Sequence, residues 1–148
     1  MFKRLLIYGE SWIGCHGQLL KDELLRRGND VDIFDHTKIL PGIIKKNLSQ
    51  RIKRRLFIKY YENKIRKKFM EKIEDWRPSC ILICKGINLN SAFLKKIKDN
   101  GYFLINWNPD DFLNPLNSNK ELLLSIKYYD LIISSRPHLF DEYRKYGG

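Results

Sequence analysis

Residues 106–111, Asn-Trp-Asn-Pro-Asp-Asp, place two carboxylates, two amides and an indole within six positions. They follow an apolar run at 102–105 that is typical of a buried strand, and Pro109 prevents that strand from continuing. Asp110 and Asp111 could orient a sugar hydroxyl, act as a general base or bind a divalent cation. Alternatively, Asp110 caps a turn and Asp111 is solvated. Adjacent side chains rarely aim at one point, so we expect at most one functional carboxylate.

The neighbours of these carboxylates also allow two interpretations. Trp107 could stack on a sugar ring, or it could fill the core near the end of the strand. Asn108 could bind substrate, or it could satisfy backbone groups of its own loop.

A glycine-rich loop, Gly-Glu-Ser-Trp-Ile-Gly-Cys-His-Gly at 9–17, follows the first apolar run and precedes a helical pattern. Glycines let backbone approach a ligand closely, and the helix N-terminus favours an anion. The loop is neither GxGxxG nor a GK[ST] loop, and a simple tight turn is an equal alternative. Glu10 and His16 are candidate acid/base groups, and Ser11, Gly14 and Gly17 are candidate substrate contacts.

Unusual residues follow the other apolar runs as well. Lys85 and Asn88 follow the third run, and Ser134 and Arg136 follow the fifth, where they could hold a phosphate or cap the last helix. Asp35 and His36 follow the second. In open α/β sheets, ligands bind beyond the carboxyl ends of the strands. The sequence therefore predicts one site built from several strand ends.

The elements that would position these residues alternate along the chain. Strands are predicted at 5–8, 31–34, 80–84, 102–106 and 131–133, and helices at 18–27, 91–99, 119–128 and 140–146. This alternation predicts a single α/β domain over 1–148 with a doubly wound, mostly parallel, five-stranded Rossmann-like sheet. A long basic helical insertion is predicted at 43–76.

The charge of the chain is concentrated in that insertion. Residues 45–72 hold twelve Lys and Arg and two acidic residues, so they carry +10 of the net charge of +11. Three explanations stay open: a solvated helix face, an anionic membrane surface or polyanion, and, least favoured, nucleic acid. The candidate anion-binding residues are Arg51, Lys53, Arg54, Arg55, Lys67 and Lys68.

Composition narrows the remaining function classes. No apolar run approaches the roughly 18–20 residues of a membrane span, and the N-terminal apolar run is too short for a signal peptide, so a cytoplasmic protein is expected. The three cysteines form no CxxC pair, which favours reduced thiols and predicts no metal site. A receiver-like phospho-acceptor domain would need an Asp after the third strand, where this chain has Lys85-Gly86.

Several of these motifs occur in the order found in a known family. The loop at 9–17, Lys85-Gly86 with Asn88-Leu89, the stretch at 106–111, Tyr-Tyr-Asp-Leu-Ile-Ile at 128–133 and Tyr-Arg-Lys-Tyr-Gly at 143–147 form the set. With this set the chain resembles the N-terminal half of CgeB-like bacterial glycosyltransferases of the GT-B fold.

The resemblance implies an acceptor-binding domain that acts in cell-envelope or surface polysaccharide and glycoconjugate synthesis. Its partners would be a sugar or glycoconjugate acceptor and a C-terminal donor-binding domain or partner chain. A nucleotide-sugar donor is expected only with that second domain, no other cofactor is expected, and the domain would be inactive alone. Gly14, His16, Gly17, Asp110 and Asp111 would face the interdomain cleft. One general base is expected among Asp110, Asp111, His16 and Glu10. If the basic segment binds lipid, the protein would lie at the inner face of the membrane.

Overall fold

The fold is built on a five-stranded, all-parallel sheet, as the sequence predicts. The computed structural model describes residues 4–42, 47–114 and 117–148. The strand order is β2-β1-β3-β4-β5, and every neighbouring pair is parallel. The strands are β1 (Arg4–Gly9), β2 (Asp30–Asp35), β3 (Cys80–Cys84), β4 (Phe103–Trp107) and β5 (Leu131–Ile133).

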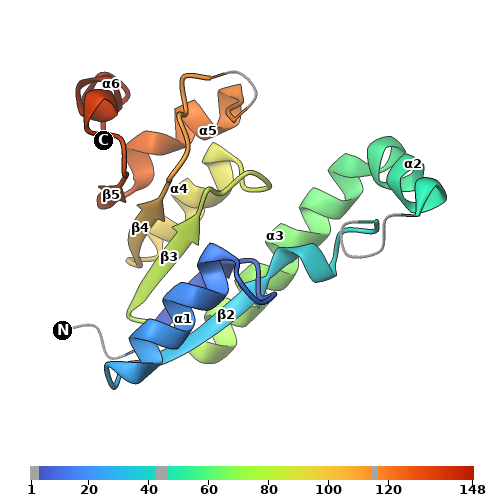
Figure 1. Cartoon of the computed structure of the whole chain (residues 1–148), viewed down its shortest axis with the longest axis horizontal. Coiled ribbons are helices and arrows are strands. Elements are labelled where there is room, and N and C mark those ends of the chain that lie inside the picture. Colours follow the sequence, from blue (N-terminus) through green and yellow to red (C-terminus); the bar gives the residue numbers. More distant parts are fainter. Residues whose placement is uncertain (1–3, 43–46, 115–116) are drawn as a thin grey trace.

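Helices cover both faces of this sheet (Figure 1). Helix α1 (His16–Arg26) packs on one face, and α3 (Ile58–Trp76) and α4 (Ser91–Asp99) pack on the other. The C-terminal region adds α5 (Lys120–Ser125) and α6 (Phe140–Lys145). Three short 3-10 turns are also present: η1 (His36–Lys38), η2 (Ile126–Tyr128) and η3 (Pro137–Leu139).

The core follows the alternation of side chains along the strands. In β1, Leu6 and Tyr8 point toward α3, where they meet Ile65, Phe69 and Ile73. On the opposite face, Leu5 and Ile7 of β1 pack with Val31, Leu82 and Ile105 beneath α1. Because β1 and β3 are buried on both faces, they are apolar nearly throughout, which is the pattern that makes them recognisable in the sequence.

A third, smaller cluster anchors the loop after β4. Phe112 is buried against Tyr143 of α6, with 4.1 Å between the ring centroids. Leu122, Ile126 and Leu139 complete this cluster. The loop that carries Asp110 and Asp111 is therefore held by a core of its own between β4 and the C-terminal helices.

The segment predicted as a long basic helical insertion is helical, but one continuous long helix is not confirmed. The segment forms two helices, α2 (Leu48–Leu56) and α3, which meet at Phe57, and positions 43–46 lie outside the described residues. Phe57 ends α2 and begins α3 with a non-helical backbone (φ −113°, ψ 26°). The break lets α3 follow the sheet with four buried residues, while α2 projects from the body of the molecule and buries none (Figure 1).

Candidate functional site

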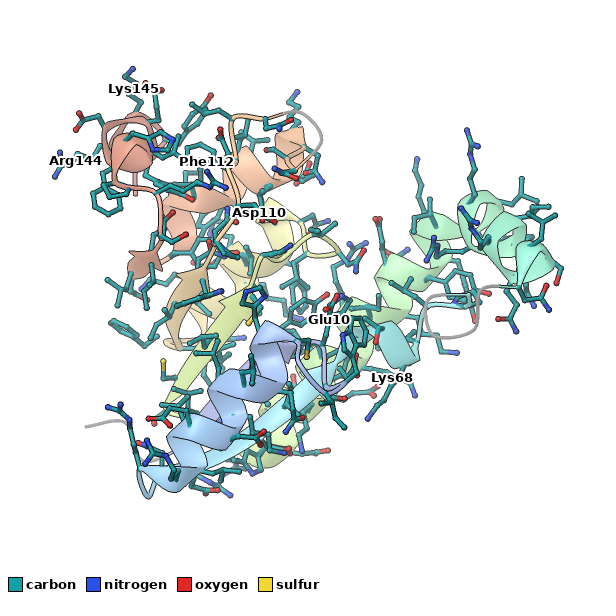
Figure 2. The ribbon with its side chains drawn as sticks, viewed as in Figure 1. Glu10, Lys68, Asp110, Phe112, Arg144 and Lys145 are labelled. Carbon is teal, nitrogen blue, oxygen red and sulfur yellow. The ribbon has the colours of Figure 1, made fainter. Side chains whose placement is uncertain are left out.

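A cavity of about 80 Å³ lies at the carboxyl ends of the strands. In the order β2-β1-β3-β4-β5 the chain leaves β1 toward β2 and later returns to β3 on the other side, so the topological switch point lies between β1 and β3. Loops after four strands line the cavity, with Gly9, Glu10, His16, Gly17, His36, Cys84, Lys85, Ile87, Trp107 and Pro109. Figure 2 shows Glu10 and Asp110 at this end of the sheet, on the loops after β1 and β4.

The loop after β1 is closed tightly onto the start of α1. The Sγ of Cys15, the N-cap residue, donates to the Glu10 carbonyl at 2.8 Å and accepts from the Gln18 amide at 3.4 Å. A Cβ on Gly17 would lie 2.4 Å from the Glu10 carbonyl oxygen. Only glycine therefore lets the helix begin this close to the loop.

Asp35, at the end of β2, ties the same loop to the next one. Its Oδ2 accepts from the amide and hydroxyl of Ser11 at 3.1 and 2.5 Å, and its Oδ1 accepts from the amide and hydroxyl of Thr37 at 2.9 and 2.5 Å. Burial opposes ionisation of Asp35, but these hydrogen bonds outweigh it and lower its pKa. Ser11, a predicted substrate contact, thus has a structural partner.

Glu10 is the carboxylate that lines the cavity. Burial raises its pKa, the charges of Lys85 and His16 oppose that rise, and the charge of Asp35 adds to it. A carboxyl group with a raised pKa beside a cation in a cavity is suited to proton transfer.

Lys85 joins the ends of β3 and β4. Its Nζ lies 2.6 Å from Oδ2 of Asp110, and its backbone amide donates to the Trp107 carbonyl at 2.9 Å. Lys85 has φ +63° and Gly86 has φ +83°. A left-handed backbone at a lysine is uncommon and unfavourable, and such strain often marks functional positions.

His36 is a cavity residue that was not among the predicted site residues. Its ring stacks on Tyr8 with 4.8 Å between centroids and 7° between planes. Burial lowers the pKa of His36 to about 4, against the opposing charge of Asp35. Its buried Nδ1 has no hydrogen-bond partner within the described residues. Its position in the sequence could have indicated a role in the site, because His36 follows β2 just as His16 follows β1 and His138 follows β5.

Aromatic and thiol groups complete the cavity wall. Trp107 and His16 approach with 6.3 Å between ring centroids, so the loops after β1 and β4 meet there. The buried Nε1 of Trp107 has no partner within the part of the chain that the structure describes. Burial raises the pKa of Cys84 to about 12, so its thiol stays protonated and is a poor nucleophile.

Other predicted site residues build loops outside the set that lines the cavity. Oδ1 of Asp111 accepts from the Leu113 amide at 2.9 Å, and Oδ1 of Asn108 accepts from the Asp110 amide at 3.3 Å. Ser134 Oγ accepts from the Arg136 amide at 3.2 Å, and Arg136 Nε donates to the Pro109 carbonyl at 3.2 Å. The first three contacts are local to their loops, and the bond from Arg136 to Pro109 holds the loop after β4 against the segment after β5.

Three groups of predicted residues lie elsewhere. Gly14 is exposed with φ +87°, and Asn88 is buried with its carbonyl accepting from Arg66 of α3 at 3.3 Å. The basic candidates lie on α2 and α3, apart from the cavity: Arg51, Lys53, Arg54, Arg55, Lys67 and Lys68. The structure therefore separates the strand-end site from the basic surface.

The described residues contain neither a metal-binding cluster nor a membrane-spanning helix. No group of three or more His, Cys, Asp or Glu side chains among them could hold a metal ion. No helix in the same residues is long and apolar enough to cross a membrane.

Comparisons with family models, curated proteins and solved structures gave no significant match to this chain. We therefore infer the function from the geometry of the cavity and from the sequence motifs.

Proposed function

We propose that this chain is the acceptor-binding domain of a GT-B-type glycosyltransferase and that the strand-end cavity receives a hydroxyl group of the acceptor. The observation that carries the proposal is the environment of Glu10. Its carboxyl group is partly buried in a cavity at the switch point and has a raised pKa, and the positive charge of Lys85 acts on it. The resemblance of the motifs to CgeB-like glycosyltransferases supports the same reaction class.

Among the four predicted bases, the geometry favours Glu10. Asp110 is paired with Lys85, and Asp111 caps a turn, so each already has a structural partner. His16 also lines the cavity but is exposed at the start of α1, whereas Glu10 is partly buried in the cavity wall. A general base must reach the proton that it removes, and a carboxylate in the cavity wall is placed to do so.

The proposed step is a displacement at the anomeric carbon of a nucleotide-sugar donor. The acceptor oxygen forms the new bond to that carbon while its proton passes to the Glu10 carboxylate, and the nucleotide leaves with the electron pair of the broken bond. The donor would be held by a second domain or a partner chain. In this proposal Trp107 stacks on the acceptor ring, and neutral His36 accepts a hydrogen bond from a second hydroxyl.

The size of the cavity agrees with a shared site. At about 80 Å³ it is small beside the roughly 300–1,000 Å³ of pockets that enclose drug-sized ligands. It can take one polar edge of a sugar, and a facing domain would enclose the rest.

The test is a titration of the ¹⁵N-labelled chain with free hexoses, N-acetylhexosamines and uronic acids, followed by NMR. We expect a member of the panel to shift the Trp107 indole signal and the amides of Glu10, Gly17 and Lys85. Glu10→Gln should weaken this binding, and Asp75→Asn, an exposed carboxylate on α3, should leave it unchanged. The proposal would be contradicted if no sugar in the panel shifts the NMR signals of the cavity residues.

A further inference from the structure

Helix α2 carries an apolar stripe that nothing in the described chain covers. Leu48, Ile52 and Leu56 are 69%, 52% and 72% exposed, and no residue of α2 is buried. Their spacing of four places the three side chains within roughly 80° of arc along one side of the helix. Single exposed apolar residues are ordinary on a protein surface, but a stripe of three on one projecting helix is not.

The stripe continues into the junction with α3. Phe57 and Tyr60 are 54% and 59% exposed. Tyr60 packs edge-on against Tyr61 at 5.3 Å between centroids, and Tyr61 contacts the main core. The exposed apolar surface is thus attached to the body of the domain by α3.

Positive charge surrounds the stripe. Arg51, Lys53, Arg54 and Arg55 lie on α2, which contains no acidic residue. None of these four forms an ion pair with any residue that the structure describes. By the helical repeat, Arg51 and Arg55 border one side of the stripe and Lys53 borders the other. Lys67 and Lys68 extend the exposed positive surface along α3.

We propose that α2 docks in the interface of an anionic lipid bilayer. A projecting helix with an apolar stripe between basic flanks is the pattern of helices that lie in the membrane plane, with the apolar side among the acyl chains and the cations at anionic headgroups. Nucleic acid would use the charges but would leave Leu48, Ile52 and Leu56 in water. The lipid surface accounts for both features.

The experiment is flotation of the chain of residues 1–148 with two kinds of vesicle, one of phosphatidylcholine alone and one of an equal mixture of phosphatidylcholine and phosphatidylglycerol. We expect binding to the mixed vesicles only. Binding should fall by about an order of magnitude or more when the basic residues are neutralised or when the stripe is made polar. The first variant neutralises the basic residues and carries Arg51→Gln, Lys53→Gln, Arg54→Gln and Arg55→Gln together. The second, called the serine variant, makes the stripe polar and carries Leu48→Ser, Ile52→Ser and Leu56→Ser together.

Matched controls use exposed residues on other elements. Leu19→Ser with Leu25→Ser changes exposed leucines of α1, and Lys96→Gln with Lys120→Gln removes exposed charges on α4 and α5. Both control chains should bind as the parent does. Because every substituted apolar residue is exposed, the unfolding midpoints should agree with that of the parent.

Three results would overturn the proposal. The first is no binding to the anionic vesicles. The second is retained lipid binding by the serine variant. The third is binding to duplex DNA, under the same conditions, that is stronger than binding to vesicles and is unchanged by the serine substitutions, which would assign the surface to nucleic acid.

Discussion

The Nζ of Lys85 lies 2.6 Å from Oδ2 of Asp110, and this ion pair joins the loop after β3 to the loop after β4. Lys85 reaches this position with φ +63°, a left-handed conformation that costs a non-glycine residue about 1–2 kcal/mol. A partly exposed ion pair returns only about 0–1 kcal/mol. The geometry therefore holds a cation at the cavity wall with no net gain in stability, which is typical of functional positions.

This balance predicts an order of stabilities for Lys85 variants. Lys85→Met keeps the backbone strain and loses the ion pair, so its free energy of unfolding should fall by less than about 1 kcal/mol. Lys85→Gly loses the pair but relieves the strain, so it should be more stable than Lys85→Met. Urea denaturation measures both. A glycine variant less stable than the methionine variant would show that the left-handed backbone is not unfavourable here.

Glu10 should destabilise the fold when it is ionised. Because burial raises its pKa in the folded state, the folded chain binds more protons than the unfolded chain above pH 4.5, and stability from this group falls as pH rises through that window. Glu10→Gln should therefore be more stable than the parent at pH 7, and the difference should vanish below about pH 4.5. Denaturation curves at both pH values test this, with Asp75→Asn as the control. A variant less stable than the parent at pH 7 would contradict it.

His36 should stay neutral well below the usual range for histidine. Its folded pKa of about 4 lies below the usual 6.5, so the unfolded chain binds more protons between these values and stability from His36 is lost as pH falls through them. Titration of the ring protons by NMR should place His36 near 4. His36→Gln should flatten the dependence of stability on pH between about 6.5 and 4. A His36 midpoint near 6.5 would show that the ring is hydrated.

Gly17 should resist substitution because a side chain would not fit there, and not because of its backbone angles. In Gly17→Ala the new Cβ would meet the Glu10 carbonyl at 2.4 Å, and relief of that contact requires backbone movement. We expect a loss of about 1–3 kcal/mol in the free energy of unfolding, together with shifts of the Glu10 NMR signals.

Gly101→Ala is the matched control for this change. A Cβ at Gly101 meets no atom within 4 Å, but φ is +82°. It should cost about 1 kcal/mol through the backbone alone and leave the Glu10 signals unchanged. Equal effects of the two variants on Glu10 would exclude the steric explanation.

The local pattern of the sequence determined the elements and their class. The apolar runs at 80–84 and 131–133 became β3 and β5 with unchanged bounds. For β3 the reason is that a strand covered by helices on both faces must be apolar in nearly every position, whereas β5 is an edge strand with Leu131 and Ile133 exposed. Strand-helix alternation then led to the parallel sheet, since parallel strands need crossover connections. The prediction that chemistry gathers at strand ends follows from the same topology, and the cavity lies there.

Tertiary contacts decided what the pattern left open. Apolar residues recur every four positions at 48, 52 and 56 and again at 65, 69 and 73, yet only the second set packs against the sheet, because the helix is interrupted at Phe57. The carboxylates of Asp110 and Asp111 are equivalent by type, but one reaches Lys85 and the other caps a turn. Likewise, burial raises the pKa of Glu10 and lowers that of His36, and residue type alone predicts neither shift. The sequence determines which groups arrive at the sheet edge, and packing between distant segments determines which of them are charged, paired or open to a ligand.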